Sequence, residues 1–272
     1  MAGPVLLGVC GWPVGHSRSP AMHGAALRAA GLRDWRYLLV PIPPERFDET
    51  VRDLPARGFR GLNVTIPHKE AALALAGEIT PAARAIGAAN MLTFGPGGAV
   101  EADNTDAEGL LGALPADHPP AGRSALVLGA GGAARAAVWA LREAGAADVA
   151  VWNRTAQRAR ALAEELGARA VETPPKADIV VNCTSVGMND PDETFKTLPL
   201  QADELDAGSL VVDMVYRPGG TRLLQVAQDR GAETVDGLEI LVAQGAASFE
   251  RWTGHPAPRD VMRAAVRDDR PS

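Results

Sequence analysis

Lysine is scarce in this chain, although basic residues in general are not. Of the 27 lysine and arginine residues, only Lys69, Lys176 and Lys196 are lysine. Arginine stays charged under ordinary conditions, whereas lysine can release a proton where its surroundings lower its pKa. Lys69, in the stretch NVTIPHKE after a β-branched run, is therefore a candidate for proton chemistry. The alternative is a lysine at a helix start with its ammonium group in water.

Other absences exclude several classes of protein. No stretch approaches the roughly 18 apolar residues of a membrane span, and the opening MAGPVLLGVCGWP lacks the basic lead of a signal or transit peptide. Cys10 and Cys183 lie far apart in apolar contexts, so we expect neither a disulfide nor a metal site. A net charge of −6 without a basic stripe disfavours nucleic acid and anionic membranes as partners. These features predict a cytoplasmic protein.

The composition that remains, 46% hydrophobic and 22% charged, is typical of a globular domain. Strand-like and helix-like segments alternate along the chain. The predicted strands include 5–11, 35–42, 61–67, 148–152, 178–182 and 210–214, and the first predicted helices are 19–31, with Ser19 as N-cap, and 45–57. Alternation with short connections predicts an α/β fold with mostly parallel sheets. The Pro-rich polar stretch 115–124 separates two such regions.

The second region opens with a glycine-rich motif, VLGAGGAAR. Gly129, Gly131 and Ala134 fit G-x-G-x-x-A between an apolar strand and a helix. The first glycine allows a tight turn, the second lets the backbone approach a pyrophosphate, and the helix N-terminus faces the anion. Gly132 widens the approach. The motif predicts a dinucleotide site, and a glycine-rich packing turn is the alternative.

The tip of the next strand indicates which dinucleotide binds. An NAD site usually has an acidic residue there for the ribose 2′-hydroxyl, but this tip reads Asn153-Arg154-Thr155. Arg154 can stack on adenine and pair with a 2′-phosphate, and Arg158 lies one helical turn further on. The cluster favours NADP over NAD, and a solvated arginine is the alternative.

Small polar residues gather in the first region. Ser17 and Ser19 precede a helix N-terminus, where a small anion is stabilised. Three of the chain's six asparagines, Asn63, Asn90 and Asn104, fall at predicted strand ends or turns, and Asp106 falls at a helix start. Capping and turn formation are the alternatives for each of them. Together these side chains could bind an anionic, polyhydroxylated ligand.

These segments together resemble the shikimate dehydrogenase family from end to end. The matching motifs in the first region are G-x-P-x-x-H-S-x-S-P at 11–20, N-V-T-x-P-x-K at 63–69, G-A-x-N at 87–90 and D-N-T-D-x-x-G at 103–109. Those that follow are G-A-G-G-A at 129–133, N-R-T at 153–155, N-x-T-S-x-G-M at 182–188, D-x-x-Y-x-P-x-x-T at 213–221 and D-G-x-x-x-L-x-x-Q at 236–244.

The resemblance implies a fold of two α/β domains. A discontinuous substrate-binding and catalytic domain would comprise 1–110 plus 239–272, and a Rossmann dinucleotide-binding domain would comprise 111–238. The implied reaction is the reversible, NADP-dependent reduction of 3-dehydroshikimate to shikimate, on the route to chorismate and the aromatic amino acids. The implied assembly is a monomer or a homodimer.

The resemblance also assigns residues to roles. Lys69 and Asp106 would be the catalytic pair. The substrate would be bound by Ser17, Ser19 and Tyr216 near its carboxylate and by Asn63, Thr65, Asn90 and Gln244 at its hydroxyls. NADP would be bound by Gly129, Ala130, Gly131, Gly132, Ala133, Asn153, Arg154, Thr155, Arg158, Thr184, Ser185 and Gly237.

Elementary chemistry gives Lys69 a task in such a reaction. Hydride transfer to a ketone leaves an alkoxide that must gain a proton, and an ammonium group can donate it. Asp106 would favour the charged ammonium, whereas desolvation would oppose it. The sequence leaves open whether Lys69 alone or the pair relays the proton. We expect His68, between Pro67 and Lys69, to face outward.

Two rival functions remain at this point. One is a quinate or quinate/shikimate dehydrogenase that uses NAD, against which the tip at Arg154 argues. The other is a non-catalytic metabolite sensor on the same fold, against which the presence of both Lys69 and Asp106 argues.

Overall fold

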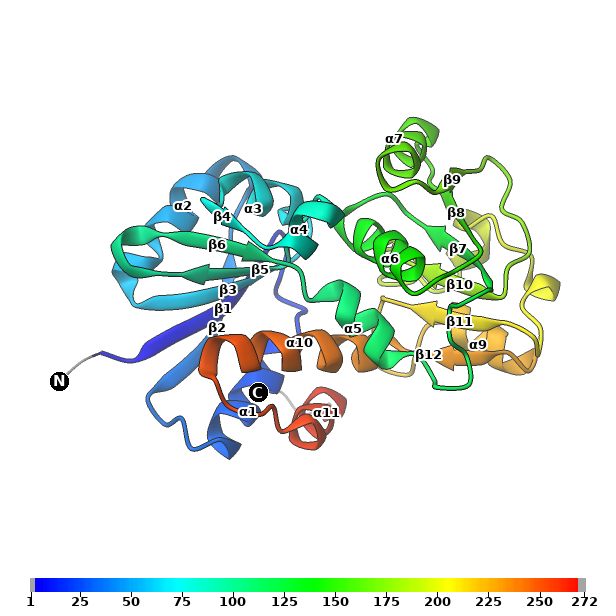
Figure 1. Ribbon diagram of the computed structural model, residues 1–272. Coiled ribbons are helices and arrows are strands. Elements are labelled where there is room, and N and C mark those ends of the chain that lie inside the picture. Colours follow the sequence, from blue (N-terminus) through cyan, green and yellow to red (C-terminus); the bar gives the residue numbers. More distant parts are fainter. Residues whose placement is uncertain (1–2, 269–272) are drawn as a thin grey trace. The chain divides into compact units, whose positions relative to one another are not determined.

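The computed structural model describes residues 3–268, which form two compact units (Figure 1). Unit 1 comprises the described residues up to Gly109 and from Leu241 onward, and unit 2 comprises Leu110–Ile240. Each unit contains one six-stranded sheet. The helices α5 (Asp106–Ala113) and α10 (Gly237–Thr253) include residues of both units. The predicted α/β class with mostly parallel sheets is confirmed.

The sheet of unit 1 has the strand order β2-β1-β3-β5-β6-β4. β1 is parallel to β2 and β3, β4 is parallel to β6, and β5 is antiparallel to β3 and β6. The strands are β1 (Val5–Gly11), β2 (Trp35–Pro41), β3 (Phe59–Val64), β4 (Glu78–Ile79), β5 (Met91–Phe94) and β6 (Val100–Asp103). The helices wholly within the unit are α1 (Ser19–Ala29), α2 (Phe47–Asp53), α3 (Lys69–Leu75), α4 (Pro81–Ile86) and α11 (Arg259–Arg267).

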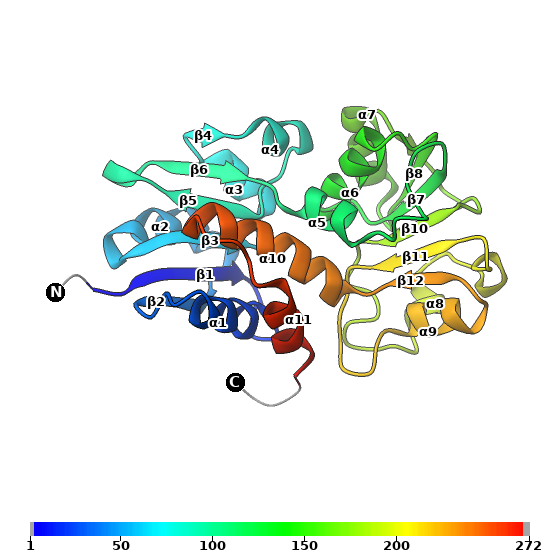
Figure 2. The same ribbon diagram turned by 60° about the horizontal axis from the view of Figure 1, so that its bottom comes forward.

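Alternation along β3 explains why helices cover both faces of this sheet. Leu62 and Val64 belong to the core that α2 and α3 close on one face. Gly61 and Asn63, which alternate with them, point to the opposite face, where a Cβ on Gly61 would lie 2.2 Å from the indole nitrogen of Trp252 in α10. Figure 1 shows α2 and α3 on one side of the sheet, with α1 and α10 on the other. Figure 2 shows α11 beside α1, which it contacts.

The sheet of unit 2 is parallel throughout, with the strand order β12-β11-β10-β7-β8-β9. Its strands are β7 (Ser124–Leu128), β8 (Asp148–Trp152), β9 (Arg169–Ala170), β10 (Ile179–Asn182), β11 (Leu210–Asp213) and β12 (Glu233–Val235). Its helices are α6 (Gly132–Glu143), α7 (Ala156–Leu166), α8 (Thr194–Thr197) and α9 (Arg222–Asp229). Helix α6 contacts β7 and β8, and α9 contacts β11 and β12.

Three boundaries differ from those predicted from the sequence. The predicted helix 45–57 is broken into the short α2 and two 3₁₀ turns, which have Pro44 and Pro55 at their starts. The predicted strand 61–67 ends at Val64. Ser19 is the first residue of α1 rather than its N-cap, which is Arg18 and makes no side-chain cap bond. Among the helices of residues 3–268, none is long and apolar enough to cross a membrane.

His23 is the most deeply buried ionisable side chain on α1. It is fully buried, its ring stacks on Tyr37 with centroids 4.2 Å apart, and neither ring nitrogen has a hydrogen-bond partner. Burial lowers the pKa of His23 from 6.5 to about 3. The imidazole is therefore neutral at neutral pH and packs as an apolar ring.

His23 should make the stability of the protein depend on pH. Between pH 6.5 and about 3 the unfolded chain binds a proton at His23 that the folded chain does not bind. Stability should therefore be full above pH 6.5 and fall by about 1.4 kcal/mol per pH unit below it. We predict that His23→Leu reduces the loss of unfolding free energy between pH 7.5 and pH 5.0 by about 2 kcal/mol, measured by urea denaturation.

The matched control is His255→Leu, because His255 is exposed. This substitution should leave the pH dependence of the unfolding free energy unchanged. Parallel pH curves for wild type and His23→Leu would contradict the prediction.

Candidate active site

Lys69 and Asp106 form a nearly buried ion pair in unit 1. Lys69 opens α3 and Asp106 opens α5, and Lys69 Nζ lies 2.5 Å from Asp106 Oδ2. Their side chains are 12% and 13% exposed, respectively. A charged pair with little solvent access needs further hydrogen bonds to offset its desolvation. The pair keeps only a small exposed surface.

The second oxygen of Asp106 receives such a bond. Asn90 Nδ2 donates to Asp106 Oδ1 over 2.8 Å. The backbone N–H of Asp106 donates to Asn104 Oδ1 over 3.0 Å, so Asn104 serves the start of α5. The carboxylate of Asp106 therefore faces Lys69 and Asn90 instead of capping its own helix.

A cluster of amides and hydroxyls surrounds this pair. Asn90 Nδ2 lies 3.2 Å from Gln244 Oε1 and 3.0 Å from Thr105 Oγ1, and Thr105 N donates to Asn90 Oδ1 over 2.7 Å. A Cβ on Gly109 would lie 2.6 Å from Gln244 Cβ, so glycine lets α5 and α10 approach closely there. Asn63 donates from Nδ2 to the carbonyl of Asn90 over 3.3 Å. The structure thus brings together Lys69, Asp106, Asn63, Asn90 and Gln244.

The serine and threonine hydroxyls lie at the carboxyl ends of neighbouring strands. Ser17 Oγ accepts from the backbone N–H of Ser19 over 3.3 Å in the loop after β1. Thr65 follows β3, and its N–H donates to the carbonyl of Cys10 in β1 over 2.9 Å. Ser17 and Thr65 are half-buried, whereas Ser19 is 4% exposed. Ligands of parallel α/β sheets bind at these strand ends.

His68 lies inside the protein, contrary to prediction. It is 2% exposed, its ring stacks on Phe47, and its Nε2 lies 2.7 Å from the carbonyl oxygen of Ile42. The outward prediction extended strand alternation to a residue that follows the end of β3 and a turn. Burial lowers the pKa of His68, so the ring is neutral and can donate to Ile42. This bond ties the residue before Lys69 to the corner after β2.

In unit 2, Gly129 ends β7 in a conformation that favours glycine. Its φ is +114°, its N–H donates to Trp152 over 2.7 Å, and a Cβ there would lie 3.2 Å from Cys183 and 3.4 Å from Thr184. The backbone therefore turns sharply between the ends of β8 and β10. Gly131 occupies the N-cap position of α6 with no side-chain cap and open space beside its Cα. The first N–H groups of α6 thus fit a pyrophosphate at Gly129, Ala130, Gly131, Gly132 and Ala133.

The tip after β8 fits the second phosphate of NADP. Asn153 Nδ2 donates to the carbonyl of Thr155 over 3.0 Å and shapes the turn. Arg154 and Arg158 are exposed, and neither guanidinium group has a hydrogen bond or ion pair within residues 3–268. Two uncommitted guanidinium groups with no carboxylate in 153–155 suit a phosphate dianion.

A buried carboxylate shapes the loop that carries Tyr216. Asp213 accepts from Asn182 Nδ2 over 2.9 Å, from Val215 N over 3.0 Å and from Thr221 Oγ1 over 2.7 Å. Burial raises the pKa of Asp213 to about 6 although these bonds oppose the rise.

The neighbouring tips carry the remaining predicted residues of this unit. Thr184 donates to Asn182 Oδ1 over 2.7 Å, and Ser185 beside it is exposed. Gly237, which begins α10, lies so close to the end of β11 that a Cβ would be 2.7 Å from the carbonyl oxygen of Met214.

Three residues of the polar cluster in unit 1 were missed from the sequence. Thr105, Tyr37 and Ser248 are all buried and bond to Asn90 or Asn63. Thr105 lies within the D-N-T-D motif. Ser248 follows Gln244 by four residues, a spacing that places both on one face of α10. Tyr37 gave no comparable signal, because it is one of several apolar residues on a strand.

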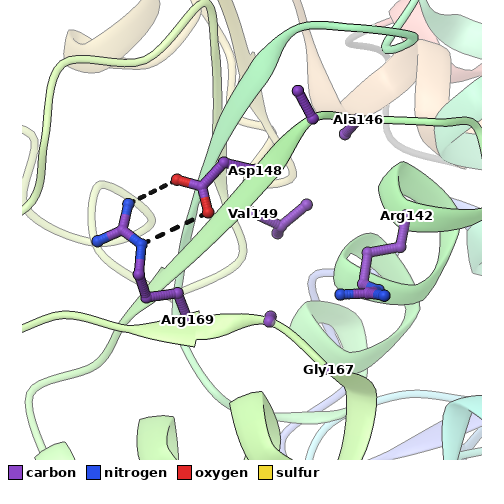
Figure 3. Close-up of a pocket in the computed structure, with 8 residues that line it drawn as sticks. Arg142, Ala146, Asp148, Val149, Gly167 and Arg169 are labelled. Carbon is purple, nitrogen blue, oxygen red and sulfur yellow. Dashed lines mark hydrogen bonds and ion pairs between the residues drawn. The ribbon is translucent and has the colours of Figure 1, made fainter.

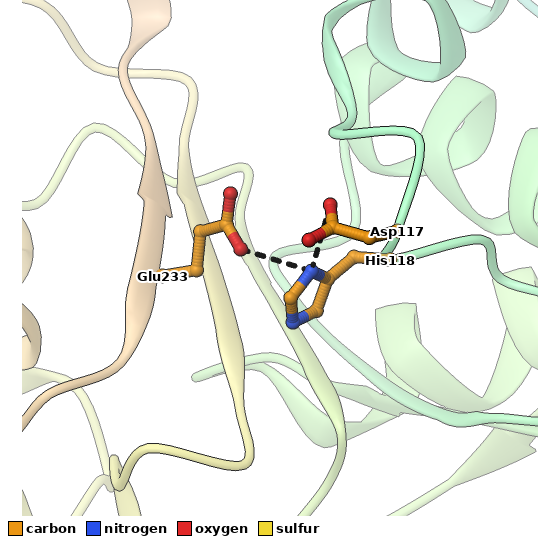
Figure 4. A group of neighbouring side chains, drawn as sticks. All are labelled: Asp117, His118 and Glu233. Carbon is orange, nitrogen blue, oxygen red and sulfur yellow. Dashed lines mark ion pairs between the residues drawn. The ribbon is translucent and has the colours of Figure 1, made fainter.

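Two other features of unit 2 share no residue with the predicted site. A hollow of about 330 Å³ is lined by Arg142, Asp148 and Arg169 among others, and Arg169 bonds to Asp148 within it (Figure 3). His118 Nδ1 lies 2.9 Å from Glu233 and 3.4 Å from Asp117 (Figure 4). These three could contact a metal ion, but exposed acidic groups commonly lie together without one.

Three sequence families match successive parts of the chain. The family described as shikimate dehydrogenase substrate binding domain matches residues 9–92. The family described as shikimate / quinate 5-dehydrogenase matches residues 118–187. The family described as shikimate 5'-dehydrogenase C-terminal domain matches residues 237–267.

Individual proteins match over nearly the whole chain. A shikimate dehydrogenase (NADP(+)) of Thermus thermophilus is 48% identical, with 95% of this chain and 97% of the relative covered. A protein of the same name from Roseobacter denitrificans is 44% identical, with 96% and 97% covered. The crystal structure of a Thermus thermophilus shikimate 5-dehydrogenase in complex with NADP(H) and shikimate superposes with a TM-score of 0.86 at 44% identity, covering 97% of this chain and 98% of that one.

The buried position of His68 leads to a stability prediction. His68→Leu keeps an apolar contact with Phe47 but removes the N–H that faces the carbonyl of Ile42. An unsatisfied buried acceptor should lower the free energy of unfolding by about 1–2 kcal/mol, measured by urea denaturation at pH 7.5. His68→Gln, whose amide can donate to the same carbonyl, should recover part of the loss. Wild-type stability in both variants would show that the bond contributes nothing.

Proposed function

Because this chain belongs to the shikimate dehydrogenase family, we propose that it catalyses the reversible, NADP-dependent reduction of 3-dehydroshikimate to shikimate. The observation that carries the proposal is the Lys69–Asp106 pair set in a cluster of buried amides and hydroxyls. This reaction lies on the route to chorismate and the aromatic amino acids.

Lys69 supplies the proton in this reaction. When bound, the reduced cofactor provides the hydride that adds to the ketone carbon. The carbonyl oxygen becomes an alkoxide as its carbon is reduced, and the ammonium of Lys69 is the donor placed to protonate it. Asp106 holds that ammonium at 2.5 Å while Asn90 holds the carboxylate. In the reverse direction the neutral amine of Lys69 takes the proton from the hydroxyl.

The remaining polar side chains of unit 1 recognise the substrate. Ser17 and Ser19 offer hydroxyls to its carboxylate, next to the start of α1, and Tyr216 also serves the carboxylate. Its hydroxyls are bound by Asn63, Thr65, Asn90 and Gln244. An amide cluster suits such a ligand because each hydroxyl can both donate and accept a hydrogen bond.

Unit 2 binds the cofactor. The backbone from Gly129 to Ala133 receives the pyrophosphate, and Asn153, Arg154, Thr155 and Arg158 receive the adenosine 2′-phosphate. Thr184, Ser185 and the backbone at Gly237 serve the nicotinamide half. Two observations support these cofactor-binding roles. The start of α6 has no side-chain cap, and the guanidinium groups of the two arginines have no other partner within residues 3–268.

The domain assignment follows these roles. Residues 1–110 plus 239–272 form the substrate-binding and catalytic domain, and residues 111–238 form the dinucleotide-binding domain. The division of the structure into two compact units supports this assignment. We propose the cytoplasm as the place where the enzyme works, and a monomer or homodimer as its assembly.

The proposal predicts a specific pattern in a two-by-two assay. Purified protein is offered shikimate or quinate, each with NADP or NAD, and reduced nicotinamide is followed by absorbance. Turnover should be confined largely to shikimate with NADP. Lys69→Ala should lower kcat by about 10²–10⁴-fold, the usual contribution of a positioned general acid.

Lys176→Ala is the matched control, because Lys176 is an exposed lysine paired with Asp206. It should keep wild-type kcat. Preference for quinate with NAD would replace the proposal by the quinate dehydrogenase alternative. Binding of shikimate without turnover of any pair would favour a metabolite sensor.

Cofactor choice should depend on Arg154. Arg154→Gln removes the guanidinium that is proposed to pair with the 2′-phosphate. We predict that KM for NADP rises about 10–100-fold while KM for NAD changes less than about 3-fold, measured by initial rates at fixed ionic strength.

Arg160→Gln is the control for this change. Arg160 lies on α7, the helix that follows Arg154, but is paired with Glu172. Equal increases of KM for NADP and NAD in Arg154→Gln would show that the arginine does not recognise the 2′-phosphate.

A further inference from the structure

The carboxamide of Asn63 is held by three hydrogen bonds. The hydroxyl of Tyr37 lies 2.7 Å from Asn63 Oδ1. Asn63 Nδ2 lies 3.0 Å from Ser248 Oγ and 3.3 Å from the backbone carbonyl oxygen of Asn90. Tyr37 is 7% exposed and Ser248 is fully buried, so water cannot replace these partners freely.

These partners permit one orientation of the amide. Both hydroxyls can donate or accept, but the carbonyl oxygen of Asn90 can only accept. The NH2 group of Asn63 must therefore face Asn90 and Ser248, and Oδ1 must face Tyr37. The Tyr37 hydroxyl then donates to Oδ1, which keeps one lone pair for a further donor.

Tyr37 and Ser248 are themselves fixed. The Tyr37 ring lies flat on His23, at an interplanar angle of 4°, and His23 is tilted against Trp252 at 6.1 Å. Ser248 Oγ lies 3.2 Å from the carbonyl oxygen of Gln244 and 3.2 Å from Thr105 Oγ1. Tyr37 is therefore held through its ring, and Ser248 through two further hydrogen-bond partners.

We infer that Tyr37 and Ser248 are positioning residues that lock the Asn63 carboxamide with Oδ1 as a hydrogen-bond acceptor for a substrate hydroxyl. This inference rests on the proposed function, because it concerns how one of the proposed substrate ligands is oriented. It also sets a specificity rule. The substrate group that meets Asn63 must donate a hydrogen bond, so a hydroxyl is accepted there and a ketone oxygen is disfavoured.

The test is a double-mutant cycle between Tyr37 and Asn63. Tyr37→Phe keeps the ring on His23 but removes one of the three hydrogen bonds that hold the amide. We expect kcat/KM for shikimate to fall about 10-fold, mainly through KM, with KM for NADP unchanged. In an Asn63→Ala background the same Tyr37→Phe change should cost less than about 2-fold, because the group that it positions is absent.

Ser248→Ala should behave like Tyr37→Phe in both backgrounds. Thr253→Val is its matched control, because Thr253 lies on the same helix and its hydroxyl bonds to a backbone carbonyl within that helix. It should leave kcat/KM unchanged. Thermal unfolding of each variant separates lost stability from lost binding, since a purely structural Tyr37 would lower the melting temperature and leave KM for shikimate unchanged.

Two results would overturn the inference alone. One is a kcat/KM for shikimate in Tyr37→Phe that lies within 2-fold of the wild-type value. The other is an equal loss from Tyr37→Phe with and without Asn63, which would mean that Tyr37 acts elsewhere. If the wild-type protein itself does not turn over shikimate, the proposed function fails and this inference fails with it.

Discussion

The need to hold a lysine and an aspartate together with little water determines the design of unit 1. Two charges in a nearly closed space are stable only where their remaining hydrogen-bonding positions are filled. Asn90 fills one position on Asp106, and Thr105 and Gln244 hold Asn90 in turn. Each buried amide needs further buried partners for its own hydrogen bonds. This explains why polar groups lie between β3 and α10, where an α/β protein usually has only aliphatic side chains.

Unit 2 has a different constraint in the proposed function, because its backbone must come close to the cofactor. Glycine follows β7, and the short polar side chains of Asn153, Asn182 and Thr184 lie at or just after the ends of β8 and β10. Gly129 and Gly237 both lie where a side chain would strike a neighbouring strand end. The buried Asp213 organises the loop beyond β11 by accepting three hydrogen bonds. In the proposed function, unit 1 therefore recognises the substrate through side chains and unit 2 binds the cofactor largely through backbone, with charge added at Arg154 and Arg158.

Much of this was predictable from the sequence, for identifiable reasons. The alternation of strands and helices depends on neighbours within about ten residues, and it led to a correct fold class. The glycine motif is equally local, and the tight turn that it predicted at Gly129 is present. The polar residues at strand ends stood out because such residues are rare in apolar surroundings. Tyr37 and Ser248 did not, because their partner Asn63 is 26 and 185 residues away. His68 was placed wrongly because the regular alternation of a strand was extended past its end. Local pattern identifies which residues are unusual, whereas tertiary packing decides what they touch.

Helix α10 carries three residues whose contacts must all form at the same time. Gly237 in its first turn lies against the end of β11, whereas Gln244 and Ser248, two and three turns later, lie in the amide cluster. Each residue of an α-helix is rotated by about 100° from the one before it. Inserting or deleting one residue between Gly237 and Gln244 would thus turn either the glycine or the polar pair onto the wrong face. During evolution this stretch can change its side chains but not its length, unlike the loops around it.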